Sequence, residues 1–109
     1  MKAWKKESDF QKYVIDRIKR ELPKAIVMKN DSSYIQGIPD LSVLYGNKYA
    51  MLEVKKSEAD RKHPQTNQED YICLFADWGA FSSFIYPEVY DEKIDALLRY
   101  FKGGSDVQV

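Results

Sequence analysis

A glycine–asparagine pair at 46–47 separates two strand-like runs, and this turn constrains the fold more than any other feature of the chain. Such a pair between two runs of this kind is typical of a two-residue β-hairpin. We expect strands at 41–45 and 48–55. A two-residue turn makes Tyr45 face Lys48, and counting back along both strands sets Asp40 opposite Glu53. Because side chains alternate between the faces of a strand, Lys55 shares their face.

This register brings two carboxyl groups together beside an ammonium group. The Cβ atoms of directly opposed residues lie about 4.5–5.5 Å apart. Ionised Asp40 and Glu53 therefore repel unless one binds a proton or a cation lies between them. Mg²⁺ commonly takes one or two carboxylates together with water and phosphate oxygens. With a lysine to orient water or stabilise charge on a phosphate, the set is typical of phosphodiester hydrolysis. A surface salt-bridge ladder, with Lys55 between the two carboxylates, is the alternative.

Hydrophobic periodicity and breaker residues predict the remaining elements. Apolar residues at spacing four predict a first helix that ends before Pro23. Its start is open, because Ser8 with Gln11 resembles a capping box whereas the lysines before them favour an earlier turn. The other elements are a strand at 25–28, a loop at 57–64, a helix at 66–78, a strand at 81–86 and a helix at 90–101. The order α-β-β-β-α-β-α predicts the α/β class, with a mixed sheet flanked by helices.

The pattern also predicts which residues form the core and how the chain divides. We expect one domain over 1–104 and a flexible tail at 105–109. The second face of the hairpin is apolar and is predicted as core: Leu41, Val43, Ala50, Leu52 and Val54. The helix at 66–78 has an apolar stripe that includes Leu74 and Trp78. We expect this stripe, together with Cys73, to pack against the sheet.

Composition excludes several classes of protein. A chain of 109 residues is long enough for a single core. Its one cysteine excludes an internal disulfide framework and a cysteine-based zinc site. No apolar run reaches 18 residues, so we expect no membrane span. The lysines at the N-terminus are not followed by the apolar segment of a signal peptide, so we expect a cytoplasmic protein.

The net charge of zero conceals an uneven distribution of charge. Residues 1–29 carry nine basic and four acidic groups, whereas residues 57–109 carry five basic and ten acidic groups. Nucleic-acid-binding domains are usually basic, so a net charge of zero, taken alone, argues against a nucleic-acid-binding domain. A neutral total is nevertheless compatible with one basic face. The alternative interpretation is that solvated helix faces carry charges of different sign by chance.

The residues around the hairpin resemble a known nuclease motif. Gly37-Ile38-Pro39-Asp40, followed thirteen residues later by Glu53-Val54-Lys55, resembles the bipartite motif of the PD-(D/E)XK nuclease superfamily. Within it, the chain looks most like the small stand-alone VRR-NUC nucleases, many of them encoded by phages. Glu7 resembles the family's helical glutamate. Pro64 followed by Gln68 resembles its proline-then-glutamine element, for which Gln65 is the other candidate. The resemblance covers roughly residues 4–88.

The resemblance implies a fold and a role for each matching residue. It implies a restriction-endonuclease-like αβββαβ core, to which this chain adds a C-terminal helix. Asp40, Glu53 and the backbone carbonyl of Val54 would bind Mg²⁺ or Mn²⁺, with Glu7 as an additional ligand. Lys55 would position the attacking water, and Gln68 would hydrogen-bond near the metal or the phosphate. The implied activity is metal-dependent hydrolysis of DNA phosphodiesters, selective for branched DNA such as Holliday junctions.

Three alternatives or extensions of this function stay open from the sequence. A nicking or restriction-type phage endonuclease would act on ordinary duplex, and a non-catalytic DNA-binding module would keep the fold alone. A homodimer is expected, because symmetric cleavage needs two sites. The last helix (Ile94, Leu97, Leu98 and Phe101) or the last strand would supply its interface. If phage-encoded, the protein would act in the cytoplasm of a bacterial host.

Several residues near the motif are candidates for contact with DNA. Lys5 and Lys6 belong to the basic N-terminal segment, and Lys56, Arg61 and Lys62 follow the third strand. All five would bind backbone phosphates as cations. Tyr34 precedes the motif and would stack on a base. The alternative is that these cationic side chains simply belong to a solvated loop and that Tyr34 packs within its own loop.

Overall fold

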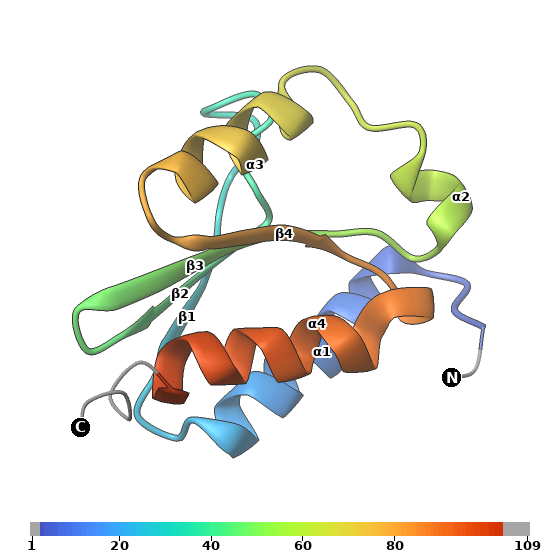
Figure 1. Ribbon diagram of the computed structural model, residues 1–109. Helices are drawn as coiled ribbons and strands as arrows, with labels where there is room; N and C mark the ends of the chain where they lie inside the picture. The colour runs from blue at the N-terminus through green and yellow to red at the C-terminus, as the bar shows by residue number, and fades with distance from the viewer. Residues whose placement is uncertain (1–2, 104–109) are drawn as a thin grey trace.

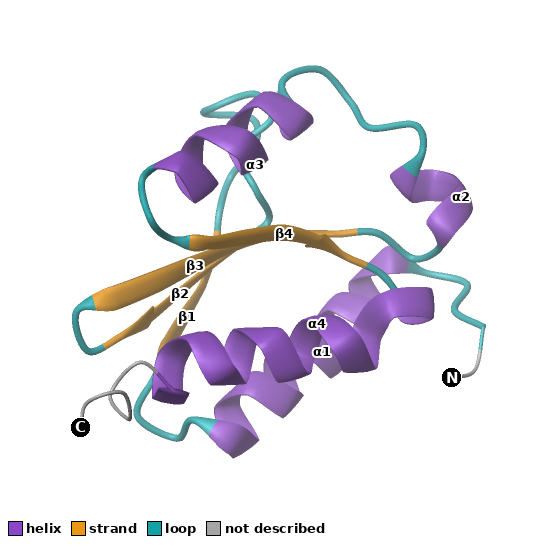
Figure 2. Cartoon of the chain, viewed as in Figure 1, coloured by secondary structure: helices purple, strands orange, loops and turns teal. Residues whose placement is uncertain are grey.

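The computed structural model describes residues 3–103, which form a four-stranded sheet between two layers of helix (Figures 1 and 2). The predicted tail at 105–109 lies outside the described residues. The sheet order is β1 (Ile26–Lys29), β2 (Leu41–Tyr45), β3 (Lys48–Val54) and β4 (Phe81–Ile85). The first three strands pair antiparallel, and β4 runs parallel to β3. The predicted mixed sheet is therefore confirmed.

The hairpin has the register that its two-residue turn predicts. Tyr45 pairs with Lys48, Val43 with Ala50 and Leu41 with Leu52. Gly46 has a φ of +64°, a conformation that side-chain-bearing residues rarely adopt. The predicted core residues Leu41, Val43, Ala50, Leu52 and Val54 are all fully buried.

Helices α1 (Glu7–Glu21) and α4 (Tyr90–Leu98) cover this apolar face of the sheet (Figure 1). They bury Phe10, Val14, Ile18, Ile94 and Leu97 against it. A short 3₁₀-helix (Pro87–Val89) precedes α4, and a π-helical turn (Arg99–Gly103) follows it.

The burial of α4 bears on the expected dimer interface. Ile94, Leu97 and Phe101 contribute to this chain's own core, so these three side chains are not free to contact a second copy. The prediction that the last helix supplies an interface through them is wrong. The apolar spacing used for that prediction reflects packing within one chain.

The first helix begins earlier than a cap at Ser8 allows. Lys6 is its N-cap residue, with extended backbone and no side-chain cap, and Ser8 lies inside the first turn. The ring of Trp4 packs against Phe10 and Tyr13, with centroids 5.6 and 5.4 Å apart. These contacts fix where the chain enters the helix, so Glu7 is its first residue.

The segment 57–64, predicted as a loop, contains the short helix α2 (Glu58–Arg61). The Ser57 hydroxyl accepts a hydrogen bond from the N–H of Asp60 at 3.1 Å, which caps that turn. Four polar and charged residues give no apolar periodicity, so only the spacing of Ser57 and Asp60 signals the helix.

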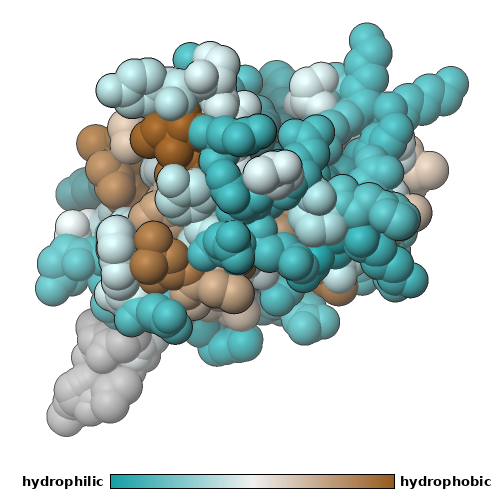
Figure 3. Space-filling model, turned by 90° about the horizontal axis from the view of Figure 1, so that it is seen from above, coloured by the Kyte–Doolittle hydropathy of each residue, from teal (hydrophilic) through white to brown (hydrophobic). Residues whose placement is uncertain are grey.

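Helix α3 (Gln68–Asp77) lies on the other face of the sheet, and it is far less buried than predicted. Cys73 is exposed, Leu74 is partly exposed and Trp78 is 63% exposed. The helix packs mainly on β3 and β4, and solvent covers its remaining surface. Seen from above, hydrophobic side chains gather at the left of this face and hydrophilic side chains at the right (Figure 3). The predicted burial of Cys73 and Trp78 is therefore wrong.

Candidate active site

The carboxyl pair predicted from the hairpin lies at the end of β2 and β3 that is farthest from the turn. The backbone N–H of Asp40 donates to Glu53 Oε1 at 3.2 Å. The N–H of Val54 donates to Asp40 Oδ2 at 2.9 Å. Glu53 is only 2% exposed. Each carboxyl is thus held by the backbone of the opposite strand, which fixes the pair relative to the sheet.

Lys55 and Gln68 complete the buried part of this cluster. Lys55 Nζ lies 3.8 Å from Glu53 Oε2, and both side chains are buried. Gln68 is the first residue of α3, and its Nε2 donates to the same Glu53 oxygen at 2.9 Å. Its Oε1 accepts from the backbone N–H of Gln65 at 2.9 Å. The structure therefore brings Gln68 to Glu53, whereas Gln65 is exposed.

Glu7 lies at the rim of the cluster. It is the first residue of α1 and is partly buried. Burial and the negative charge of Asp40 raise its pKa, while Lys55 acts in the opposite direction. Glu7 therefore lies near enough for the charges of Asp40 and Lys55 to act on it, but it does not form a three-carboxyl metal-binding group with Asp40 and Glu53.

All three carboxyl groups hold a proton more strongly than usual. Burial raises the pKa of Glu53 to about 8, and the neighbouring Asp40 charge adds to the effect, which Lys55 only partly opposes. Burial also raises the pKa of Asp40, although the Val54 N–H and Lys55 favour its charged form. A buried cluster of carboxylates that repel one another is stabilised by any positive charge that reaches it.

The donor atoms fit a hard divalent cation. Across residues 3–103, no three His, Cys, Asp or Glu side chains converge on one point as a ready metal-binding group. The pair of buried Glu53 and partly buried Asp40 offers two carboxylates, and its oxygens match the preference of Mg²⁺ for a few carboxylates plus water. The set contains no nitrogen or sulfur atom of the kind that Zn²⁺ sites use.

The basic candidates fall into two groups. Lys5 and Lys6 are exposed just before Glu7. Lys56 is partly buried, and its charge acts on Glu7. Lys62 is exposed, with its Nζ 3.7 Å from Glu58 Oε2. Lys5, Lys6 and Lys62 are thus exposed enough for a phosphate to reach them, whereas Lys56 is only partly exposed.

Arg61 is engaged within the fold instead. Its guanidinium lies 3.8 Å from the centroid of the Phe84 ring and 3.1 Å from Glu69 Oε2. It therefore joins α2 to β4 and α3. The sequence does not indicate these contacts, because Phe84 is far from Arg61 along the chain and Glu69 belongs to a different helix.

The loop before the motif contains two positions whose importance the sequence does not reveal. Asn30 Nδ2 donates to the Pro39 carbonyl at 2.9 Å and to Ser42 Oγ at 2.8 Å. Gly37 has a φ of +89°, and a Cβ there would lie 2.6 Å from both the Asn67 Cβ and the Thr66 carbonyl oxygen. The motif loop and the start of α3 thus pack with no room for a side chain. An eleven-residue connection has no register, so the sequence could not predict these contacts.

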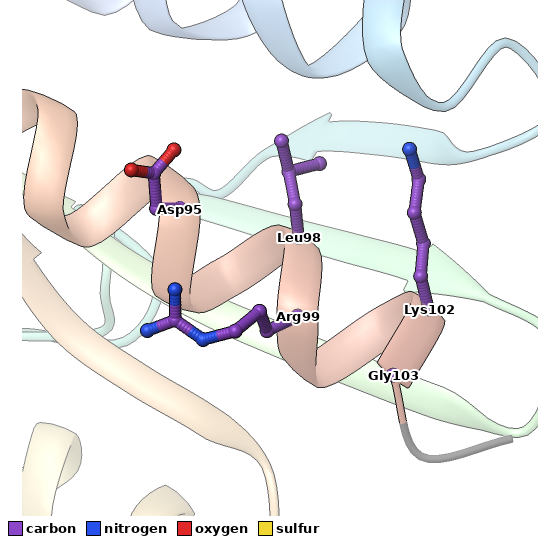
Figure 4. A pocket seen from close by; sticks show the side chains of 5 residues that line it. All are labelled: Asp95, Leu98, Arg99, Lys102 and Gly103. Carbon is purple, nitrogen blue, oxygen red and sulfur yellow. The ribbon is translucent and has the colours of Figure 1, made fainter. Parts of the chain in front are cut away.

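A separate hollow of about 310 Å³ lies on α4 and the π-helical turn, where it is lined by Asp95, Leu98, Arg99, Lys102 and Gly103 (Figure 4). Lys48, the first residue of β3, donates to the carbonyl of Tyr100 in that turn. The hollow therefore lies at the opposite end of β3 from Glu53, and it takes no part in the carboxyl cluster.

No helix in the described part of the chain is both long and apolar enough to cross a membrane.

Comparison with solved structures identifies the fold. One similar structure, described as "VRR_NUC domain", has a TM-score of 0.65 and 26% sequence identity, and the match covers 87% of this chain and 97% of the other. A second, described as "VRR_NUC domain protein", has a TM-score of 0.67 and 20% identity, with 93% and 91% covered. No protein-family model and no curated protein matches the sequence. The structural neighbours confirm the predicted resemblance to the VRR-NUC family.

Proposed function

The chain has the fold of the VRR-NUC nucleases, and from this premise we propose that it is a Mg²⁺- or Mn²⁺-dependent DNA endonuclease selective for branched DNA. One observation carries the proposal. Glu53 is buried and Asp40 partly buried, and Lys55 lies 3.8 Å from Glu53. Burial and mutual repulsion both oppose the charge of this pair, so it has no evident value as a structural element. Such a cluster is accounted for by a cation that it binds.

The proposed roles of the residues combine what the family resemblance implies with the contacts in the structure. Asp40, Glu53 and the Val54 carbonyl would hold the cation, with Glu7 beside them directly or through water. A divalent cation bound there supplies Lewis-acid stabilisation of charge on the scissile phosphate. The Lys55 ammonium orients the attacking water and stabilises negative charge on the phosphate. Gln68 holds Glu53 in place through its amide N–H.

The substrate is expected to lie along the surface formed by the start of α1 and the segment after β3. Lys5, Lys6, Lys56 and Lys62 would contact backbone phosphates there. Contacts of this kind weaken as salt rises, with a slope set by the number of phosphates neutralised. The acidic residues of the site do not oppose DNA once a cation is bound, so the neutral total charge is compatible with this function.

A homodimer completes the proposal, because two cuts placed symmetrically across a junction need two sites and one chain carries one. A twofold axis also presents two copies of the basic N-terminal segment to one DNA molecule. Light scattering on the purified protein measures this directly, and a monomer that still resolves junctions would refute it.

The central experiment compares a four-way junction with a matched linear duplex, in Mg²⁺ and in Mn²⁺. We expect cleavage of the junction, and its loss in Asp40→Asn and Lys55→Met, both with unchanged circular dichroism. Glu92→Gln, at an exposed position of α4, is the matched control and should cleave normally. Preferential cleavage of the linear duplex would favour the restriction-type alternative. Binding without cleavage in either metal would favour the non-catalytic module.

A further inference from the structure

A second hollow, of about 440 Å³, lies beside the carboxyl cluster on the same face of the sheet. It opens between the segment 30–38 and the paired residues Ser42 of β2 and Met51 of β3. Four apolar side chains and three polar ones line it: Tyr34, Ile35, Ile38 and Met51, and Asn30, Asp31 and Ser42. Pockets of this size and composition are typical of sites for small organic groups.

The hollow lies close to the candidate active site. Ser42 pairs with Met51 across the hairpin, two residues along from Asp40 and Glu53. Two residues of a strand span about 7 Å. Successive nucleotides of a duplex strand rise about 3.4 Å each. A phosphate at the carboxyl pair would therefore have a base of a neighbouring nucleotide within reach of this hollow.

The charge of the hollow excludes a phosphate as its ligand. No lysine or arginine lines it, and Asp31 is its charged residue. Hydrogen bonds from Ser33 lower the pKa of Asp31, so its carboxyl stays ionised. An anion would be repelled, whereas a flat, neutral group with N–H donors would find acceptors at Asp31 and Ser42 and apolar contact with Ile38 and Met51. Nucleobases have these properties.

Tyr34 is presented for contact from a braced segment. It is 86% exposed, although its backbone N–H donates to the Asp31 carbonyl at 3.1 Å. Asn30 ties one end of the segment to Pro39 and Ser42, and Gly37 packs against Asn67 at the other end. Holding a large aromatic ring in solvent on a fixed backbone gives the fold no packing energy, but it offers a ready surface for stacking.

We propose that this hollow binds one unpaired nucleobase next to the scissile phosphate, with Tyr34 stacking on it. The proposal rests on the nuclease function proposed above and gives a physical reason for selectivity toward branched DNA. A base in a continuous duplex is paired and stacked, and taking it out costs a few kcal/mol. A base at a branch point, a flap or a frayed end is released at lower cost, so it enters the hollow more readily.

The test uses short single-stranded oligonucleotides carrying 2-aminopurine, with the protein in Ca²⁺ so that binding is measured apart from cleavage. A parallel series has an abasic site at each position in turn. We expect Tyr34→Ala to weaken binding of the oligonucleotide with all its bases by roughly 5- to 150-fold, as for loss of one stacked base. Tyr34→Phe should bind as the wild type does, because it keeps the ring. One abasic position should make the wild type and Tyr34→Ala bind equally.

Trp78→Ala is the matched control. Trp78 is also a largely exposed aromatic residue, but it lies at the end of α3 away from Gln68. Its loss should leave the affinity within about twofold, and circular dichroism should show that all variants are folded.

Three results would overturn the proposal. Equal weakening of intact, abasic and fully duplex DNA by Tyr34→Ala would mean a backbone contact. No weakening would mean that the hollow is not a base site. A change of mass in light scattering with Tyr34→Ala would mean that a second copy of the chain covers it. Failure of the nuclease proposal is distinct, since it appears as absence of cleavage by the wild type in Mg²⁺ and Mn²⁺.

Discussion

The buried glutamate at the centre of the cluster should make the metal-free protein less stable as the pH rises. The pKa of Glu53 is raised from 4.5 to about 8 in the folded protein. The folded state therefore holds a proton that the unfolded state releases between these values, and stability is lost as the pH rises through that range. The loss is on the order of 1 kcal/mol per pH unit, or a few kcal/mol between pH 5 and pH 8. This is a large part of the 5–15 kcal/mol of a typical domain.

Substitution of Glu53 by glutamine isolates this effect. Glutamine has nearly the same shape and does not titrate, so any packing penalty shifts the whole stability curve without changing its slope. Urea unfolding in EDTA at pH 5, 6, 7 and 8 gives the free energy of unfolding of both proteins. We expect the curve of Glu53→Gln to fall less steeply, by roughly 1 kcal/mol per pH unit. Glu92→Gln, an exposed change on α4, should keep the slope of the wild type.

Equal slopes for the wild type and Glu53→Gln would refute the reasoning. Such a result would mean that Lys55, 3.8 Å away, keeps Glu53 ionised across this range. The carboxyl pair would then be an ordinary ion-pair cluster, and the electrostatic argument for a bound cation would lose its basis.

Three further predictions follow from the same contacts. Mg²⁺ should raise the melting temperature of the wild type more at pH 8 than at pH 6, because protons compete with the cation for Asp40 and Glu53. In differential scanning fluorimetry, Asp40→Asn should remove this effect. Gly37→Ala should lower the free energy of unfolding by about 1–3 kcal/mol, since its Cβ would overlap Asn67. Gly46 also has a positive φ but lies in open space, so Gly46→Ala should lower it less. Equal losses would mean that backbone strain alone is responsible. Lys6→Glu should weaken binding to duplex DNA and reduce its salt dependence more than Lys24→Glu, in the turn after α1, does, as measured by fluorescence anisotropy in Ca²⁺. Equal effects would place the DNA elsewhere.

The sequence was sufficient for the parts of the site that local geometry determines. The Gly46-Asn47 turn fixes the register of β2 and β3, and that register alone brings Asp40, Glu53 and Lys55 to one face. The core on the other face follows from the same alternation. The family resemblance added Glu7 and Gln68, and their positions depend on where two helices begin.

The parts that sequence reasoning missed depend on contacts between distant segments. Spacing favours Gln68 over Gln65 without excluding Gln65, and only the packing of α3 on the sheet shows that Gln68 contacts Glu53. The apolar stripe of α3 predicts burial, but it cannot show that the helix covers only part of the sheet and leaves Trp78 in solvent. Asn30 is an ordinary loop residue in the sequence, and its contact with Ser42 becomes visible only in three dimensions.

The hairpin has a consequence for the order in which the chain folds. Asp40 and Glu53 are separated by one tight turn, and hairpins close in about 1–10 μs. Gln68 and Glu7 arrive only after the crossover to β4 and the docking of α1, which close much longer loops and are slower. Early in folding the two carboxyl groups are therefore adjacent but still surrounded by water, which screens their repulsion. Their affinity for protons and cations rises only when the helices exclude that water. Under the proposed function, cation binding would therefore be a property that the chain acquires last, and it would report that folding is complete.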